Sequence, residues 1–327
     1  MNGTRFVPVE TIDVAGLVPD AHKGKGMGNK FLGDLVQAQA LIHIVDASGA
    51  TDAEGNPVNA GTHDPLADVA FLEKELDWWI AGLISEGWER LGRRVEQGEA
   101  LEKIVSTKLA GLGISELHIK KALAHATMDP PEFRSFAAAI RRESKPLIVA
   151  ANKVDKAPPP NIERLKSLEQ GGTIVTFCSA ESELALRKAA EHKLITYQPG
   201  ATGFEPAPGA TLSAGQKTAL DYIRANVLAK FTSTGIQTAL ETAAYKLLKL
   251  IVVYPVEDET HLTDKAGNVL PDAFLIPEGT TAKEMAFLVH TDLGKHFIRA
   301  IDARTKRVIG HDHAVKNGDV IKIVADV

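Results

Sequence analysis

An apolar run leads directly into an Asn-Lys-x-Asp motif in the stretch Leu147-Ile148-Val149-Ala150-Ala151-Asn152-Lys153-Val154-Asp155. The run predicts a buried strand that ends where the motif begins, and ligands of open α/β sheets bind at the carboxyl ends of strands. A carboxylate at that place can accept two parallel hydrogen bonds from the ring N–H and the exocyclic amine of guanine, each worth about 1.5–3 kcal/mol. We therefore expect Asp155 to read a guanine base, while Asn152 and Lys153 brace the loop and cover the base.

Two further strand ends support this interpretation. Phe6–Val14 alternates like a strand and runs into Asp13-Val14-Ala15-Gly16, followed by glycine-rich residues 24–29. In a GTPase, an Asp at that place holds Mg²⁺ through water and the Gly N–H meets the γ-phosphate, so we assign these roles to Asp13 and Gly16. A short strand, Thr173–Phe177, precedes Ser179-Ala180, whose backbone groups are expected to lie behind the guanine.

The composition is that of an ordinary globular protein. A length of 327 residues predicts two or three domains, and 44% hydrophobic and 24% charged residues are typical values. A net charge of −5 argues against non-specific coating of nucleic acid, and we expect no DNA partner. The single cysteine, Cys178, excludes an intrachain disulfide and is expected to be buried at a strand end. With no signal peptide and no apolar stretch of ~18 residues, we expect a cytoplasmic protein without a membrane partner.

The expected fold class is α/β. Residues 1–63 and 146–212 are expected to form an incomplete nucleotide-binding domain, in which residues 198–212 read as a linker by composition. Residues 64–145 have helical periodicity and lie between two strands of one sheet, so we expect a helical insertion there. Residues 213–248 are expected to form a helical connection, and residues 249–327 a compact β-rich domain.

Specific stretches resemble a known family. Residues 13–18 and 24–32 resemble the second switch region of the Obg/YchF-like translation-factor GTPases, and the helical insertion is a feature of the YchF branch. Residues 290–294 and 316–320 resemble parts of a TGS domain, a β-grasp module. The resemblance covers essentially the whole chain and is closest to archaeal-type members. It implies a ribosome-associated GTPase in translation that binds GTP or GDP with Mg²⁺.

The catalytic residue is left open by the resemblance. Ras-like enzymes use a glutamine, at the place that Leu17 occupies here, to orient the attacking water. An apolar side chain cannot do this, which resembles the Obg/YchF group. His22, in the loop that follows, is a weak candidate for catalysis and is more simply interpreted as a solvated loop residue.

The phosphate-binding loop, or P-loop, is missing from the printed sequence. A GTPase needs a strand, a Gly-x4-Gly-Lys-Ser/Thr loop and a helix, together about 30 residues, and only twelve residues precede Asp13. The chain is therefore interpreted as amino-terminally truncated and deficient in hydrolysis, which leaves enzyme activity uncertain. In the family's sheet the lost first strand lies between the strand ending at Asp13 and the strand Ala40–Asp46. Its loss predicts a weakened or rearranged nucleotide-binding domain.

The β-rich tail carries a group of basic residues that could meet RNA phosphates: Arg299, Arg304, Lys306 and Arg307. A solvated hairpin explains this group equally well from composition, and the TGS resemblance favours RNA. Two functions follow. The first is a GTP-binding member of the Obg/YchF-like GTPases, and the alternative is a non-catalytic RNA- or ribosome-interaction protein built on a decayed nucleotide-binding fold.

Overall fold

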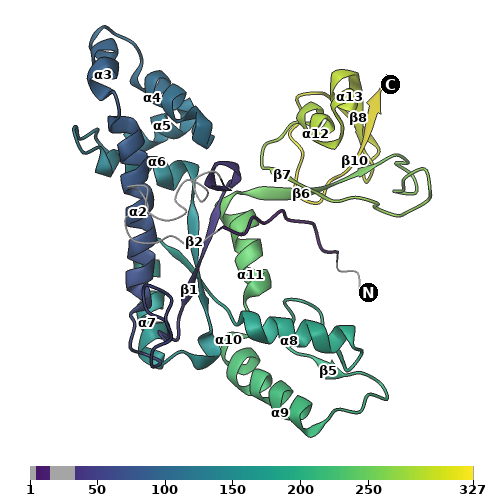
Figure 1. Cartoon of the computed structure of the whole chain (residues 1–327). Helices are drawn as coiled ribbons and strands as arrows, with labels where there is room; N and C mark the ends of the chain where they lie inside the picture. The colour runs from purple at the N-terminus through teal and green to yellow at the C-terminus, as the bar shows by residue number, and fades with distance from the viewer. Residues whose placement is uncertain (1–4, 15–33, 327) are drawn as a thin grey trace. The chain divides into compact units, whose positions relative to one another are not determined.

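The computed structural model describes residues 5–14 and 34–326. The chain forms two compact units (Figure 1). The larger unit comprises Ile12–Ala243, and the smaller unit comprises Ala244–Val327 together with Met1–Thr11. Each unit is described below by itself.

A parallel three-stranded sheet organises the larger unit. Its strands are β1 (Leu41–Asp46), β2 (Leu147–Asn152) and β3 (Ile174–Phe177), in the order β1-β2-β3. The central strand is the apolar run before the Asn-Lys-x-Asp motif, and it pairs on both edges, as Ile148 does with Ile42 and Ile174. Val45, Val149 and Val175 form one apolar layer against Leu165. The α/β class and the three expected strands are thus confirmed.

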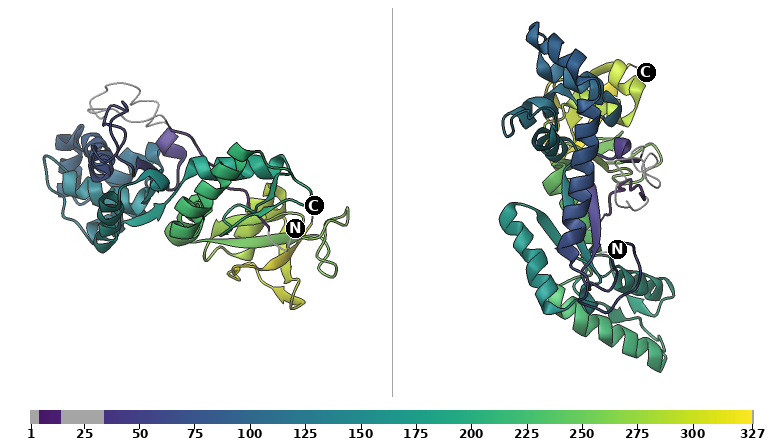
Figure 2. Two further views of the ribbon diagram at one scale, coloured as in Figure 1. Left: turned by 90° about the horizontal axis from the view of Figure 1, so that it is seen from below. Right: turned by 60° about the vertical axis from the view of Figure 1, so that its left-hand side comes forward.

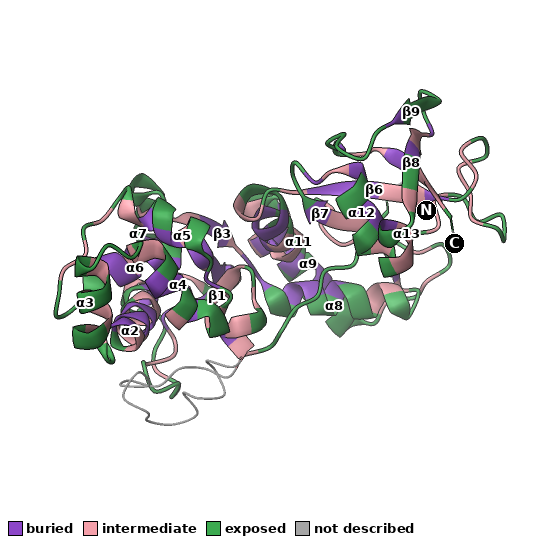
Figure 3. Cartoon of the chain, turned by 90° about the horizontal axis from the view of Figure 1, so that it is seen from above, coloured by how far each residue is buried: buried purple, intermediate pink, exposed green. Residues whose placement is uncertain are grey.

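Five α-helices separate β1 from β2. They are α2 (Pro65–Ser85), α3 (Trp88–Glu96), α4 (Leu101–Leu109), α5 (Glu116–Leu123) and α6 (Arg134–Ser144). Asp64 caps α2 by accepting the Leu66 N–H at 3.0 Å, and Pro65 starts the helix without losing a hydrogen bond. α2 runs alongside the sheet in Figures 1 and 2, and the purple bands in Figure 3 mark the buried faces of α2 and α6. Among the described residues, no helix has the length and apolar character to cross a membrane.

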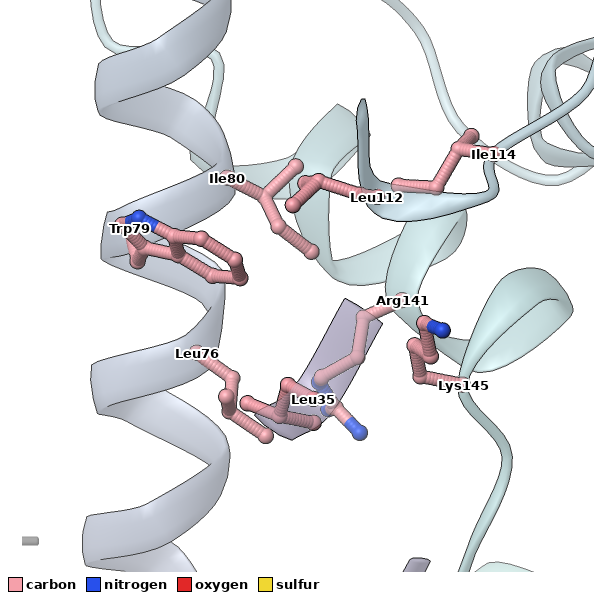
Figure 4. A pocket seen from close by; sticks show the side chains of 8 residues that line it. All are labelled: Leu35, Leu76, Trp79, Ile80, Leu112, Ile114, Arg141 and Lys145. Atoms are coloured by element: carbon pink, nitrogen blue, oxygen red, sulfur yellow. The ribbon is translucent and has the colours of Figure 1, made fainter. Parts of the chain in front are cut away.

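A buried charge network joins α2 to α6. Arg141 donates to Asp77 at 2.6 Å and to Glu73 at 3.2 Å. Burial raises the pKa of Asp77 and outweighs the opposite effect of the Arg141 guanidinium. Lys145 donates to the carbonyl oxygens of Val36 and Ala38, which anchors the segment before β1. Figure 4 shows that Arg141 and Lys145 border a small cavity that is otherwise apolar.

The rest of the larger unit is mostly helical. After β2 come α7 (Pro159–Ser167), β3, α8 (Ala180–Glu191), α9 (Ala214–Ile223), the π-helical turn η5 (Arg224–Leu228), α10 (Ala229–Phe231) and α11 (Ile236–Glu241). The expected linker over residues 198–212 is more ordered than its composition predicts. Within it, β5 (Glu205–Pro206) pairs with β4 (Ile195–Thr196), and Phe204 is buried against α8 and α9.

The prediction of a strand over Phe6–Val14 is wrong. Residues 5–14 form no strand or helix, and most of their side chains are exposed. A strand needs a hydrogen-bonded neighbour, and within the described residues none pairs with the outer edge of β1. Pro8 also lacks the N–H that a strand in a sheet interior would donate. The alternation of apolar and polar residues was therefore not enough to identify a strand. Asp13 does not lie at a strand end.

The smaller unit contains a five-stranded mixed sheet, as expected for the β-rich tail. Its order is β7 (Phe274–Pro277), β6 (Leu250–Val256), β10 (Val320–Ala325), β8 (Phe297–Asp302) and β9 (Arg307–Ile309). β6 and β10 are parallel, and the other pairs are antiparallel. The helix α12 (Ala282–Val289) buries Met285 against this sheet, and Thr281 caps it.

We expect amide hydrogen exchange to be at least about tenfold faster in Ile42–Val45 than in Ile148–Ala150. β2 is hydrogen-bonded on both edges and buried, whereas β1 pairs on one edge and Ile44 is 67% exposed. Exchange measured by mass spectrometry on overlapping peptides tests this expectation. Equal protection of the two strands would contradict it and would indicate that the outer edge of β1 is covered.

Candidate functional site

The three parallel strands end at one edge of the sheet, where their loops converge. The Ala47 N–H donates to Asn152 O at 2.9 Å, and the Cys178 N–H donates to Ala151 O at 2.7 Å, so the loops are tied together from their first residue. They surround a cavity of about 310 Å³. Its lining residues are Ser48, Ala50, Asn152, Lys153, Asp155, Lys156, Ser179 and Glu181.

The structure brings the expected base-reading residues together. The Asn152 side-chain oxygen accepts the Ala180 N–H at 3.0 Å, which links the Asn-Lys-x-Asp loop to the start of α8. The Ser179 N–H donates to the carbonyl oxygen of Thr234 at 2.9 Å. Both backbone N–H groups that were expected to lie behind the base therefore have partners within the protein in this state.

Within the described residues, the Asp155 carboxylate accepts hydrogen bonds from two neutral hydroxyl groups. The Ser179 hydroxyl donates to Oδ1 at 2.9 Å, and the Tyr222 hydroxyl lies 3.2 Å from Oδ2. In the described part of the chain, no lysine or arginine forms an ion pair with Asp155: Lys153 pairs with Asp46, and Lys156 pairs with Glu181. The negative charge of Asp155 is thus left for a ligand in the cavity.

Asp46 holds Lys153 at the cavity wall. Its Oδ2 accepts from Lys153 Nζ and from the Thr51 hydroxyl, both at 2.6 Å, and its Oδ1 accepts the Ser48 hydroxyl at 2.5 Å and the Ser48 N–H at 3.0 Å. Burial by itself raises the pKa of Asp46. The hydrogen bonds from Lys153, Ser48 and Thr51 outweigh burial and hold the pKa below the ordinary value of 3.8. Lys153 has a φ of 60°, which directs its side chain back toward β1.

Gly49 allows the loop after β1 to fold back beside the cavity. It has a φ of 60°, and a Cβ at this position would lie 2.3 Å from the carbonyl oxygen of His63. The Gly61 N–H donates to Ser48 O at 2.8 Å, and the Asn161 side chain donates to Ala47 O at 3.1 Å. Any other residue at Gly49 would force this loop open and remove Ser48 from the cavity wall.

A buried carboxylate supports the loop on the β3 side. Glu183 accepts from Arg187 at 2.5 Å and from the hydroxyls of Tyr197 and Thr234 at 2.6 Å. Burial raises its pKa, but these three hydrogen bonds produce a net lowering. Because Thr234 O also accepts the Ser179 N–H, the network fixes the loop that supplies Ser179. No sequence pattern indicated these contacts, since they depend on how α8 and α11 pack.

Cys178 is a buried structural residue, as the sequence indicated. Its side chain is 1% exposed, and burial raises the thiol pKa to about 11. The thiolate, which is the nucleophilic form, is therefore scarce at neutral pH.

Asp13 is the remaining expected nucleotide-site residue that the structure describes, and it is not placed at the cavity. Asp13 is exposed in the irregular segment and does not line the cavity. Gly16 and His22 lie outside the described residues. Within residues 5–14 and 34–326, no three His, Cys, Asp or Glu side chains are grouped so that they could hold a metal ion. The expected contact of Asp13 with Mg²⁺ through water needs no such group of ligands and stays a prediction.

The basic group of the smaller unit lies at the β8–β9 hairpin. Arg299 is on β8, Arg304 and Lys306 are in the turn, and Arg307 begins β9; all four are exposed. Asp302 fixes the turn by accepting the Arg304 N–H at 2.9 Å and the Thr305 hydroxyl at 2.6 Å. Lys306 also donates to the carbonyl oxygen of Glu259.

We expect Asp46→Asn to lower the free energy of unfolding at pH 7 by about 1–3 kcal/mol, because it removes the charge opposite Lys153. Since the folded-state pKa of Asp46 lies below 3.8, this stability is present above pH 3.8 and is lost as the pH falls through the folded-state value. The difference from the unaltered chain should shrink below about pH 4.

Urea unfolding followed by tryptophan fluorescence measures this difference, since Trp78, Trp79 and Trp88 all lie in the larger unit. Asp326→Asn, which alters an exposed carboxylate of the smaller unit, is the control and should leave the curve unchanged. A pH-independent difference would show that the charge of Asp46 contributes no stability.

Comparisons with known proteins agree with this geometry. Residues 150–258 match the model of the Obg-like GTPase YGR210-like, G4 motif-containing domain, and residues 266–325 match the TGS domain. An uncharacterised GTP-binding protein of Methanocaldococcus jannaschii is 46% identical over 331 residues, covering 99% of this chain and 83% of that protein.

Two further proteins extend the comparison. The crystal structure of a GTP-binding protein from Pyrococcus horikoshii is similar at 42% identity with a TM-score of 0.72, covering 90% of this chain and 81% of that one. The ribosome-binding ATPase YchF of Haemophilus ducreyi is 25% identical over 98% of this chain and 83% of its own length. The chain therefore belongs to the YGR210-like Obg-like GTPases of the YchF family and carries a TGS domain.

Proposed function

We propose that the chain binds guanine nucleotides and that Asp155 reads the base. The observation that carries this proposal is the Asp155 carboxylate, which lines the cavity and, among residues 5–14 and 34–326, accepts hydrogen bonds from two hydroxyls. A carboxylate offers about four acceptor sites, so two remain for a ligand. Guanine presents two parallel N–H donors on one edge, whereas adenine presents a ring nitrogen that would face the carboxylate with a lone pair.

Asn152 and Lys153 have supporting roles in this proposal. Asn152 joins the two loops at the base through the Ala180 N–H. The Lys153 stem lies at the cavity wall with its ammonium held by Asp46, where its methylene groups can cover the base. Ser179 fixes Oδ1 of Asp155. The Methanocaldococcus and Pyrococcus relatives are named GTP-binding proteins, which supports guanine nucleotide as the ligand.

Base recognition is the part of GTPase chemistry that the described residues support. The printed sequence contains no Gly-x4-Gly-Lys-Ser/Thr stretch to hold the β- and γ-phosphates. The proposal is therefore that these 327 residues bind guanine nucleotide weakly and are deficient in hydrolysis.

We expect Asp155→Asn to change the preferred base from guanine to xanthine. The Asn amide offers one donor and one acceptor, which suits the xanthine edge and mismatches the exocyclic amine of guanine. The GDP dissociation constant should rise at least about tenfold while XDP binding improves. NMR chemical-shift titration with GDP, XDP and ADP measures all three, including millimolar constants.

The matched control is Asp221→Asn, which alters an exposed carboxylate on α9 that pairs with Arg224. It should leave the GDP, XDP and ADP constants unchanged. If the unaltered chain bound GDP and ADP equally, or if Asp155→Asn left the preference unchanged, Asp155 would not be the base-reading residue.

We also propose that the smaller unit contacts ribosomal RNA through the β8–β9 hairpin. The supporting observations are its four exposed basic residues and the printed name of the Haemophilus relative, a ribosome-binding ATPase. Asp302 holds the turn in one conformation, so the cations are presented on a fixed backbone. The same contact would serve the alternative function, that of an RNA- or ribosome-interaction protein without catalysis.

We expect the combined charge reversal Arg304→Glu, Lys306→Glu and Arg307→Glu to weaken ribosome binding at least about tenfold, because contacts to phosphates are lost and repulsion replaces them. Co-sedimentation with ribosomes at physiological salt measures the loss. The control reverses three other exposed lysines of the same unit, Lys265, Lys283 and Lys295, with the same change in net charge. Equal binding by both triple variants would refute a specific role for the hairpin.

A further inference from the structure

Tyr222 makes a contact with the base-reading carboxylate that neither the sequence nor the proposed nucleotide site accounts for. It lies on α9, 67 residues beyond Asp155. Its hydroxyl lies 3.2 Å from Asp155 Oδ2 and 3.3 Å from the backbone carbonyl oxygen of the same residue. One tyrosine thus reaches both the side chain and the main chain of Asp155.

The helix that carries Tyr222 is firmly docked. On its other side, Leu220 and Ile223 are buried with Leu186 of α8 and with Phe204. Ser213 and Gln216 form a reciprocal cap at its start. A π-helical turn, η5, begins at Arg224, two residues after Tyr222, and π-helical turns are frequent at functional sites. The backbone of α9 is therefore fixed by packing, whereas the Tyr222 side chain is 42% exposed and its hydroxyl contacts Asp155.

The hydroxyl approaches Asp155 from outside the cavity. Asp155 lines the cavity, but Tyr222 is not among the lining residues. Ser179 holds Oδ1 and Tyr222 holds Oδ2, so each oxygen has one fixed donor and one remaining acceptor site. Two fixed donors hold the carboxylate in one plane. A ligand with two parallel N–H groups can bond to both oxygens only when its N–H groups lie in that plane.

We propose that Tyr222 is a positioning residue for base recognition, which holds Asp155 Oδ2 so that the carboxylate meets both N–H groups of guanine at once. This inference rests on the proposed guanine-binding function. It makes α9, expected from the sequence to be part of a connection, a component of the base site. Tyr222 acts through Asp155 and does not itself touch the base.

The test compares GDP with IDP, whose hypoxanthine base lacks the exocyclic amine and can donate only one of the two hydrogen bonds. A carboxylate that is free to rotate can still accept the single N–H of hypoxanthine. It is less often oriented to accept both N–H groups of guanine at once. Tyr222→Phe should therefore reduce the preference for GDP over IDP by roughly three- to tenfold, while IDP affinity changes little. Tyr254→Phe, which alters the smaller unit, is the control and should keep the preference unchanged.

The outcomes separate this inference from the proposed function. If the unaltered chain prefers GDP and Tyr222→Phe preserves that preference, the positioning role is refuted and guanine binding stands. A stronger GDP preference in Tyr222→Phe would also refute it, because the hydroxyl would then compete with the base. If the unaltered chain shows no preference, the proposed function fails and the positioning role fails with it.

A second measurement tests the contact without nucleotide. Burial, the Asp155 charge and its hydrogen bond raise the pKa of Tyr222. Removing that charge by Asp155→Asn should lower the Tyr222 pKa, as measured by NMR titration of ring-labelled tyrosine. An unchanged pKa would show that the hydroxyl and the carboxylate are not in contact in solution, and the inference would be wrong.

Discussion

The parallel pairing of β2 with both of its neighbours is the constraint on which the site depends. Parallel strands end at the same edge of a sheet, so strand pairing alone brings together the loops after Asp46, Asn152 and Phe177. The hydrogen bonds from Ala47 to Asn152 and from Cys178 to Ala151 extend this pairing one residue beyond the strands. A shift of register by one residue would turn Asp155 away from Ser179 and remove the cavity.

The sequence predicted the parts of the site that follow from this sheet. The apolar run before Asn152 identified β2, and the placement of Ser179 after β3 followed from the order of strands. The prediction failed for Phe6–Val14, where alternation suggested a strand but Pro8 and the absence of a pairing strand among the described residues leave the segment irregular. Periodicity reports which face of a segment is apolar, and it does not report whether an adjacent strand exists.

The contacts that sequence reasoning missed share one property: each joins elements far apart in the chain through side chains. Thr234 meets Glu183 across 51 residues, and Tyr222 meets Asp155 across 67 residues. Neither contact has a local motif, because each depends on how a helix after residue 213 packs against α8. By contrast, Ser48 and Thr51 lie close to Asp46 in the chain, so their hydrogen bonds to Asp46 could have been anticipated from the turn that Gly49 allows.

The distribution of charge around the cavity supports the proposal that one carboxylate selects the base. Lys153 and Lys156 line the cavity and form ion pairs with Asp46 and Glu181, and within the described residues neither of them forms an ion pair with Asp155. The hydroxyls of Ser179 and Tyr222 orient Asp155 without removing its charge. A charged acceptor strengthens hydrogen bonds from N–H donors and repels a lone pair. In the proposed site, guanine would present two N–H donors to Asp155, whereas adenine would place a ring-nitrogen lone pair against the carboxylate, so the proposed discrimination follows from the charge of this acceptor.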